Sequence, residues 1–223
     1  MPKKKQKQSQ VIEIPKPILY IAKFLQAISS SLTIKFAAKL FTTPIRHKLP
    51  KRELHMERES VQKSIMVPSI NKEIVVYEYG KSDKMVLLVH GWSGRGTQLV
   101  KIADELLKMG YMTISFDAPA HGKSKGNYSI MTEFIASILE LEKQYGSFEY
   151  AIGHSLGGMS VLNAIKQNLQ VKKAVTIGAG DIIQDIIDDF IKKLQLKPEY
   201  GIKLKDHFEK RFVGKMDDYS AYK

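Results

Sequence analysis

The 223-residue chain contains no cysteine. It therefore cannot form a disulfide, attack a substrate with a thiolate or bind a metal ion through cysteine sulfur. Its apolar residues make up 43% and its charged residues 26% of the sequence. These fractions are ordinary for folded proteins and exclude a largely disordered chain. The sequence thus has enough apolar residues for a core, and any nucleophile or metal ligand must be another residue type.

Acidic residues are almost absent from the first 52 positions. This segment has twelve lysines and arginines against one acid, Glu13, whereas the remaining residues hold 23 basic and 22 acidic side chains. The net charge of +12 therefore belongs almost entirely to an N-terminal extension. A run of lysines without interleaved aromatic residues or a helix-turn-helix pattern does not indicate nucleic-acid binding. We expect no nucleic-acid partner.

The extension is predicted to have two parts, a disordered basic leader over residues 1–15 and an amphipathic helical segment over residues 16–52. Apolar residues recur at helical spacing between Pro17 and Phe41, and the three serines at 29–31 are expected to divide them into two helices.

Long uncharged stretches are also missing from the extension. The longest between its lysines runs from Phe24 to Ile34, whereas a membrane-spanning helix needs about 20 apolar residues. No A-x-A cleavage site follows, so a secretory signal is not indicated and a cytoplasmic location is expected. Two alternatives remain for residues 16–41. In the first, their apolar face packs on the following domain. In the second, it makes a peripheral contact with an anionic membrane.

Strand and helix patterns alternate in the rest of the chain, which predicts an α/β fold with a mostly parallel sheet and helices on both faces. We expect the core at residues 60–180 and a helical cap segment at 181–223. The predicted strands are residues 61–67, 73–79, 85–89, 112–116, 149–152 and 173–177, and the predicted helices are residues 99–110, 128–145, 159–169, 181–196 and 199–212.

Ligands of such sheets bind at the carboxyl ends of the strands. The predicted strands at 85–89, 112–116 and 149–152 are followed by His90-Gly91-Trp92, by a segment from Asp117 to Ser124, and by Gly153-His154-Ser155-Leu156-Gly157-Gly158. The last of these contains G-x-S-x-G between a predicted strand and a predicted helix. This arrangement is typical of a nucleophile elbow.

The residue types of the elbow follow from the chemistry of a serine nucleophile. Ser155 must occupy a turn so tight that Gly153 and Gly157 cannot carry side chains. The backbone N–H of Leu156 would then point at a developing oxyanion near the start of a helix. A second donor is expected from the N–H of Trp92, with Gly91 allowing the main chain to approach.

Together these motifs resemble the α/β-hydrolase superfamily, over about residues 61–180. The resemblance implies an esterase- or lipase-like serine hydrolase that acts on a small-molecule acyl substrate through an acyl-enzyme on Ser155. Trp92 and Leu156 would form the oxyanion hole through their amides. His154, inside the elbow, is not expected to be the catalytic base. Structural roles in the elbow and the loop fall to Gly153, His154, Gly157, His90 and Gly91.

In this family the nucleophile comes first along the chain, followed by the acid and then the histidine. The sequence contains one histidine after Ser155, which is His207. It reads as part of a solvated helix face, with the role of base as the alternative. The resemblance places the acid and histidine beyond two further strands, so we expect a C-terminally truncated hydrolase with little activity by itself. Its last strand would then be an open apolar edge. The alternatives are a non-catalytic binding protein and an assembly in which another chain supplies the missing strands.

A metal or cofactor site is not predicted. His90, His121 and His154 follow neighbouring strands, but no metal-binding spacing accompanies them. The segment Gly178-Ala-Gly180 places Ile183 where a dinucleotide-binding loop needs its third glycine, and no phosphate-binding loop motif occurs. We therefore expect no metal and no cofactor.

Overall fold

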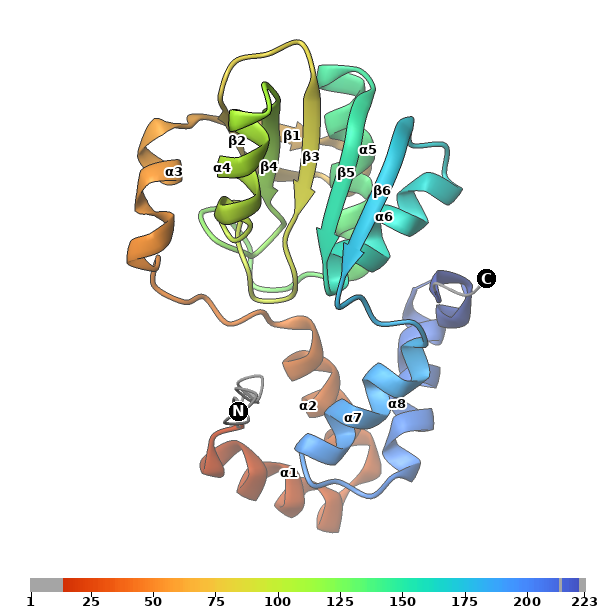
Figure 1. Cartoon of the computed structure of the whole chain (residues 1–223). Helices are drawn as coiled ribbons and strands as arrows, with labels where there is room; N and C mark the ends of the chain where they lie inside the picture. Colours follow the sequence, from red (N-terminus) through yellow and green to blue (C-terminus); the bar gives the residue numbers. More distant parts are fainter. Residues whose placement is uncertain (1–13, 213, 221–223) are drawn as a thin grey trace, which may run out of the picture. The chain divides into compact units, whose positions relative to one another are not determined.

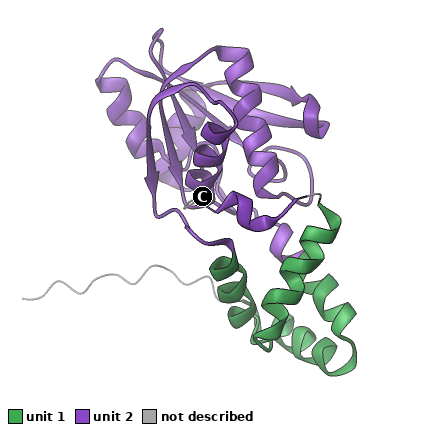
Figure 2. Ribbon diagram, turned by 90° about the vertical axis from the view of Figure 1, so that its right-hand side faces the viewer, with its two compact units in different colours: residues 1–38, 184–213 green, residues 39–183, 214–223 purple. Residues whose placement is uncertain are grey.

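The computed structural model describes residues 14–212 and 214–220 (Figure 1). The basic leader that is predicted to be disordered covers residues 1–15. Of these, residues 1–13 lie outside the described part of the chain. The chain divides into two compact units (Figure 2). One, the helical unit, comprises Met1–Ala38 and Gln184–Val213, and the other, the sheet unit, comprises Lys39–Ile183 and Gly214–Lys223.

The sheet unit contains a mixed six-stranded sheet in the order β1-β2-β4-β3-β5-β6. Strands β4, β3, β5 and β6 are parallel, whereas β1 and β2 pair with each other and β2 pairs with β4 in antiparallel fashion. The strand bounds are β1 (Val61–Val67), β2 (Lys72–Tyr79), β3 (Met85–Val89), β4 (Met112–Asp117), β5 (Phe148–His154) and β6 (Val171–Ile177). The predicted α/β class with a mostly parallel sheet is confirmed.

Helices cover both faces of the sheet (Figure 1). Alternate residues of β3 face opposite layers: Leu87 and Val89 belong to the core shared with α5 (Met131–Tyr145) and α6 (Leu156–Lys166), whereas Val86 and Leu88 pack with α4 (Val100–Lys108). Both sets are almost fully buried. Burial on both faces explains why this strand is an uninterrupted apolar run.

Several local predictions differ from the structure. The helix predicted over 159–169 is α6, which begins at Leu156, and residues 43–50 of the predicted helical segment 16–52 contain no helix. The charged stretch before β1 forms a short helix, α3 (Leu54–Glu59), whose single buried apolar residue, Met56, is too weak a signal to reveal a helix. The helix expected from residue 128 begins at Met131 instead. Ser129 donates its N–H to the carbonyl of Thr42 at 2.8 Å, and Ile130 is extended, so a contact distant in sequence delays the helix.

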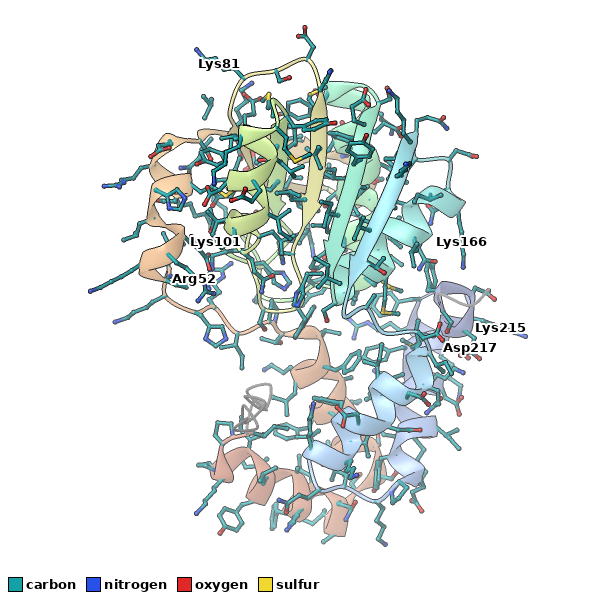
Figure 3. All side chains as sticks on the ribbon, viewed as in Figure 1. Arg52, Lys81, Lys101, Lys166, Lys215 and Asp217 are labelled. Atoms are coloured by element: carbon teal, nitrogen blue, oxygen red, sulfur yellow. The ribbon has the colours of Figure 1, made fainter. Side chains whose placement is uncertain are left out.

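Strand β6 lies at the edge of the sheet, as expected. Its apolar residues Val175 and Ile177 are 51% and 38% exposed. The chain returns to this side of the unit near its C-terminus, where Lys166 of α6, labelled in Figure 3, donates to the carbonyl of Ser220 at 3.1 Å.

The helical unit is built from α1 (Lys16–Ile28), α2 (Ser30–Thr42), α7 (Ile183–Lys193) and α8 (Glu199–Arg211), of which α2 and α7 continue into the sheet unit. The predicted break between the first two helices lies at Ser29, which is extended. Gln26 of α1 accepts the N–H of Lys197 at 2.8 Å, which joins α1 to the turn between α7 and α8. No helix in the described part of the chain is long and apolar enough to cross a membrane.

Candidate active site

Ser155 occupies the sharp turn between β5 and α6, with φ 52° and ψ −120°. Positive φ is uncommon for a residue with a side chain and indicates strain. Hydrogen bonds hold the turn on both sides: the Ser155 N–H donates to the Ile177 carbonyl at 2.9 Å, and the Ser155 carbonyl accepts the Gly158 N–H at 2.9 Å. Among the described residues, nothing hydrogen-bonds to the Ser155 hydroxyl, which is partly exposed.

The two glycines of the motif are required by space rather than by backbone conformation, because neither has positive φ. A Cβ atom at Gly153 would lie 2.5 Å from the carbonyl oxygen of Gly157. A Cβ at Gly157 would lie 2.5 Å from the carbonyl oxygen of His90. Real Cβ atoms do not approach backbone this closely, so the tight turn excludes side chains at both positions.

The loop after β3 lies directly against the elbow. A Cβ at Gly91 would lie 3.2 Å from the Cβ of Ser155, and the loop is folded back by a 2.9 Å hydrogen bond from the Gly94 N–H to the Gly91 carbonyl. The structure therefore brings the segment of Trp92 to the side of Ser155. In the described part of the chain, neither the Trp92 N–H nor the Leu156 N–H has an acceptor. Two amides without acceptors thus belong to segments that adjoin the partly exposed Ser155.

His90 is buried, and its ring connects two loops through hydrogen bonds. Its Nε2 accepts the N–H of Ala118 at 3.1 Å, so Nδ1 carries the proton and donates to the Gly91 carbonyl at 2.7 Å. Burial lowers the pKa of His90 to about 3, and the neighbouring His121 contributes. The neutral imidazole joins the end of β3 to the loop after β4.

His121 lies in the site, although no sequence motif assigns it a role there. Its ring lies 5.1 Å from the ring of Trp92 and 5.0 Å from that of His90. Nδ1 donates to the Pro119 carbonyl at 2.9 Å, which leaves Nε2 as a buried acceptor without a partner among the described residues. Burial lowers the pKa of His121 to about 4. The only available signal was its position after a predicted strand.

Asp117 fixes the loops that follow β3 and β4 to each other. Its buried carboxylate accepts the Gly96 N–H at 2.7 Å, the Lys123 N–H at 2.7 Å and the Tyr77 hydroxyl at 2.9 Å. Burial raises the pKa of Asp117, while the hydrogen bonds from the two amides act in the opposite direction. All three donors are used to build the loops, so Asp117 is an anchor of the site.

A further support comes from the segment before β1, which no local motif reveals. Arg46 donates to the carbonyls of Ala120 and Ser124 at 3.1 and 2.6 Å, and the Ile45 N–H donates to the Ser93 hydroxyl at 2.9 Å. We call residues 43–50 the strap. It holds the loops after β3 and β4, although it is distant from them in sequence.

The remaining predicted histidines differ in their surroundings. His154 ends β5, and its buried Nδ1 has no partner among the described residues. His207 lies on α8 in the helical unit, where burial lowers its pKa and the charges of Arg211 and Lys35 lower it further. No carboxylate within residues 14–212 and 214–220 hydrogen-bonds to His207. The charges that act on its pKa are the positive ones of Arg211 and Lys35, whereas a base oriented by an acid has a carboxylate beside it.

The described residues contain no group of three or more side chains that could hold a metal ion. At His90 both ring nitrogens are already used in hydrogen bonds.

Comparison with known proteins places the chain next to hydrolases. A family model described as the alpha/beta hydrolase fold matches residues 84–215. An esterase from Pyrococcus furiosus shares 21% identity and a TM-score of 0.58, over 80% of this chain and 71% of the esterase. A monoacylglycerol lipase from Paleococcus ferrophilus shares 21% identity and a TM-score of 0.51, over 63% of this chain and 52% of the lipase.

A proline iminopeptidase-related protein from Thermus thermophilus is 15% identical, with a TM-score of 0.51 over 66% of this chain and 56% of that protein. The chain thus spans little more than half the length of the last two structures. At these identities the likeness concerns the fold. No curated protein matches the chain.

Proposed function

Because the chain belongs to the α/β-hydrolase family, we propose that it is a serine hydrolase that cleaves an ester-type acyl bond of a small molecule. One observation carries this proposal. Ser155 lies in a strained turn, and no residue in the described part of the chain hydrogen-bonds to its hydroxyl. The segments that adjoin it carry the amides of Trp92 and Leu156, for which these residues provide no acceptor. A nucleophile and oxyanion donors are two of the parts that acyl transfer by a serine hydrolase requires.

The proposed reaction has two steps. Ser155 Oγ attacks the ester carbonyl, and the N–H groups of Trp92 and Leu156 donate to the developing oxyanion, because preorganised donors stabilise the transition state more than the ground state. The alcohol leaves with the proton that the serine loses. Water then attacks the acyl-enzyme, which releases the acid and restores the Ser155 hydroxyl.

The reaction also needs a base that takes the serine proton, and none of the described histidines hydrogen-bonds to Ser155 Oγ. His207 is the candidate from sequence order alone. This observation favours a second function, that of a ligand-binding protein that retains the elbow without catalysis. The two functions differ in whether Ser155 is activated.

A fluorophosphonate probe and a short-chain p-nitrophenyl ester distinguish the two functions. Under the hydrolase proposal, intact-mass analysis finds one probe per chain, located on Ser155, and Ser155→Ala abolishes both labelling and ester turnover. Ser64→Ala, at an exposed serine on β1, serves as the matched control and keeps both. Absence of labelling in a folded chain would reject the hydrolase proposal and favour the binding protein.

A further inference from the structure

Helix α1 presents its large apolar side chains to solvent. The apolar face of α1, defined by Tyr20, Ile21, Phe24 and Ile28, has exposed fractions of 70%, 47%, 65% and 60%. With about 100° of rotation per residue, these four residues occupy an arc of about 100° on one side of the helix. A surface helix normally exposes its polar side to water, whereas this side of α1 exposes large apolar side chains.

The opposite side of α1 is already used for packing. Ala22 is fully buried, Ile18 and Leu25 are half-buried, and Gln26 accepts the N–H of Lys197 at 2.8 Å. The two alternatives that the sequence left open for this segment therefore concern two different sides of one helix. The helix has an apolar side that packs within the helical unit and another that does not.

Charge indicates what the apolar face of α1 meets. Lys16 and Lys23 are exposed and border the face along one edge, and residues 14–42 contain four lysines and no acidic residue. Two copies of the chain joined through this face would bring like charges together, which is unfavourable. An anionic surface with an apolar interior accommodates both the lysines and the aromatic side chains.

We propose that α1 lies flat in the headgroup region of an anionic bilayer, with the apolar face of α1 inserted between the lipids and its lysines on the phosphates. The aromatic rings of Tyr20 and Phe24 are suited to this boundary, and the helix binds at the surface without spanning it. The proposal does not depend on the hydrolase activity.

Co-sedimentation of the full chain with vesicles tests it. We expect binding to vesicles of phosphatidylcholine with phosphatidylglycerol, little binding to phosphatidylcholine alone, and weaker binding as salt is raised. Replacing both Lys16 and Lys23 with glutamine is expected to lower the partition coefficient about 30-fold, from about fivefold for each lysine near an anionic surface. Phe24→Glu is expected to lower it at least about tenfold, because it places a charge in the apolar face.

Met109→Glu is the matched control, since Met109 is 69% exposed and lies outside the helical unit. It should leave binding unchanged, and circular dichroism should show that every variant is folded. A Tyr20→Ser/Ile28→Ser double variant, which adds no charge, should also weaken binding. The proposal is overturned if the wild-type chain does not bind anionic vesicles, or if Phe24→Glu binds them as well as wild type does. It is also overturned if the chain does not bind vesicles and sedimentation velocity instead shows a dimer that the Phe24→Glu substitution dissociates.

Discussion

The backbone N–H of Ile45 donates a 2.9 Å hydrogen bond to the hydroxyl of Ser93, a residue 48 positions later in the chain. Ser93 has φ 57° and directly follows Trp92, whose amide we propose as an oxyanion donor. The strap therefore reaches the backbone beside the proposed oxyanion hole. This contact couples a segment outside the α/β core motifs to the geometry on which the chemistry would depend.

Ser93→Ala should reduce turnover more than it reduces stability. The variant loses one hydrogen bond, worth about 1 kcal/mol, and releases the loop that carries Trp92. We expect kcat for a p-nitrophenyl ester to fall about three- to tenfold with KM little changed, because the oxyanion donor acts mainly in the transition state. Ser82→Ala, which removes an exposed hydroxyl bonded to the Gly110 carbonyl, is the control. Equal kcat values for the two variants would contradict the coupling.

The fold should lose stability as the pH falls from about 6.5 toward 4. Burial holds the pKa of His90 at about 3 and that of His121 at about 4, whereas an unfolded histidine titrates near 6.5. In this window the unfolded state binds more protons than the native state. Protonation therefore favours unfolding, by about 1.4 kcal/mol per pH unit for each histidine.

Urea unfolding between pH 7 and 4.5 measures this slope, and His121→Phe separates it from the titration of carboxylates. Removing one buried histidine should reduce the slope by about one proton, or about 1.4 kcal/mol per pH unit. His47→Phe, at an exposed position, provides the comparison. An unchanged slope in His121→Phe would show that this histidine does not contribute to the pH dependence.

Gly157→Ala should destabilise the fold by about 3 kcal/mol or more, because its Cβ would overlap the backbone at the end of β3. Gly146→Ala offers a comparison in which nothing lies within 4 Å of the added atom and only the positive φ of 84° is strained. We expect a cost of about 1 kcal/mol there. Thermal unfolding of the two variants decides the matter, and similar melting temperatures would refute close backbone approach at Gly157.

Asp117→Asn should cost about 2–4 kcal/mol, because a carboxamide turns an N–H group toward at least one of the three donors that the carboxylate accepts. Tyr77→Phe removes one of those donors and leaves the two backbone bonds intact. It should cost about 1 kcal/mol. Urea midpoints of both variants test this order, and a larger loss in Tyr77→Phe would mean that the amide contacts contribute little.

Much of the fold could be predicted because its signals are local. The apolar run at 85–89 and the strand at 61–67 have the predicted bounds, since a strand buried on both faces and a strand ended by a proline turn are recognisable within a few residues. The elbow was predictable for the same reason. A serine between two glycines, after a strand and before a helix, is a consequence of local crowding.

Features that depend on distant partners were not predictable. The late start of α5 results from the hydrogen bond between Ser129 and Thr42, and the burial of His121 results from the packing of two loops that follow different strands. The strap's contacts through Arg46 are of the same kind. Backbone carbonyls accept these bonds, and a carbonyl carries no mark in the sequence.

The sequence by itself determined the α/β class, the strand–turn–helix around Ser155 and the basic, apolar character of residues 16–41, because each is set by residue types within one or two turns of chain. Only the tertiary structure decided which side of α1 packs and which side faces solvent, and that His90, Asp117 and the strap join the loops around the elbow. The spacing of apolar residues in the sequence predicts a helix with distinct sides. The neighbours that cover a face come from elsewhere in the chain, and folding alone brings them there.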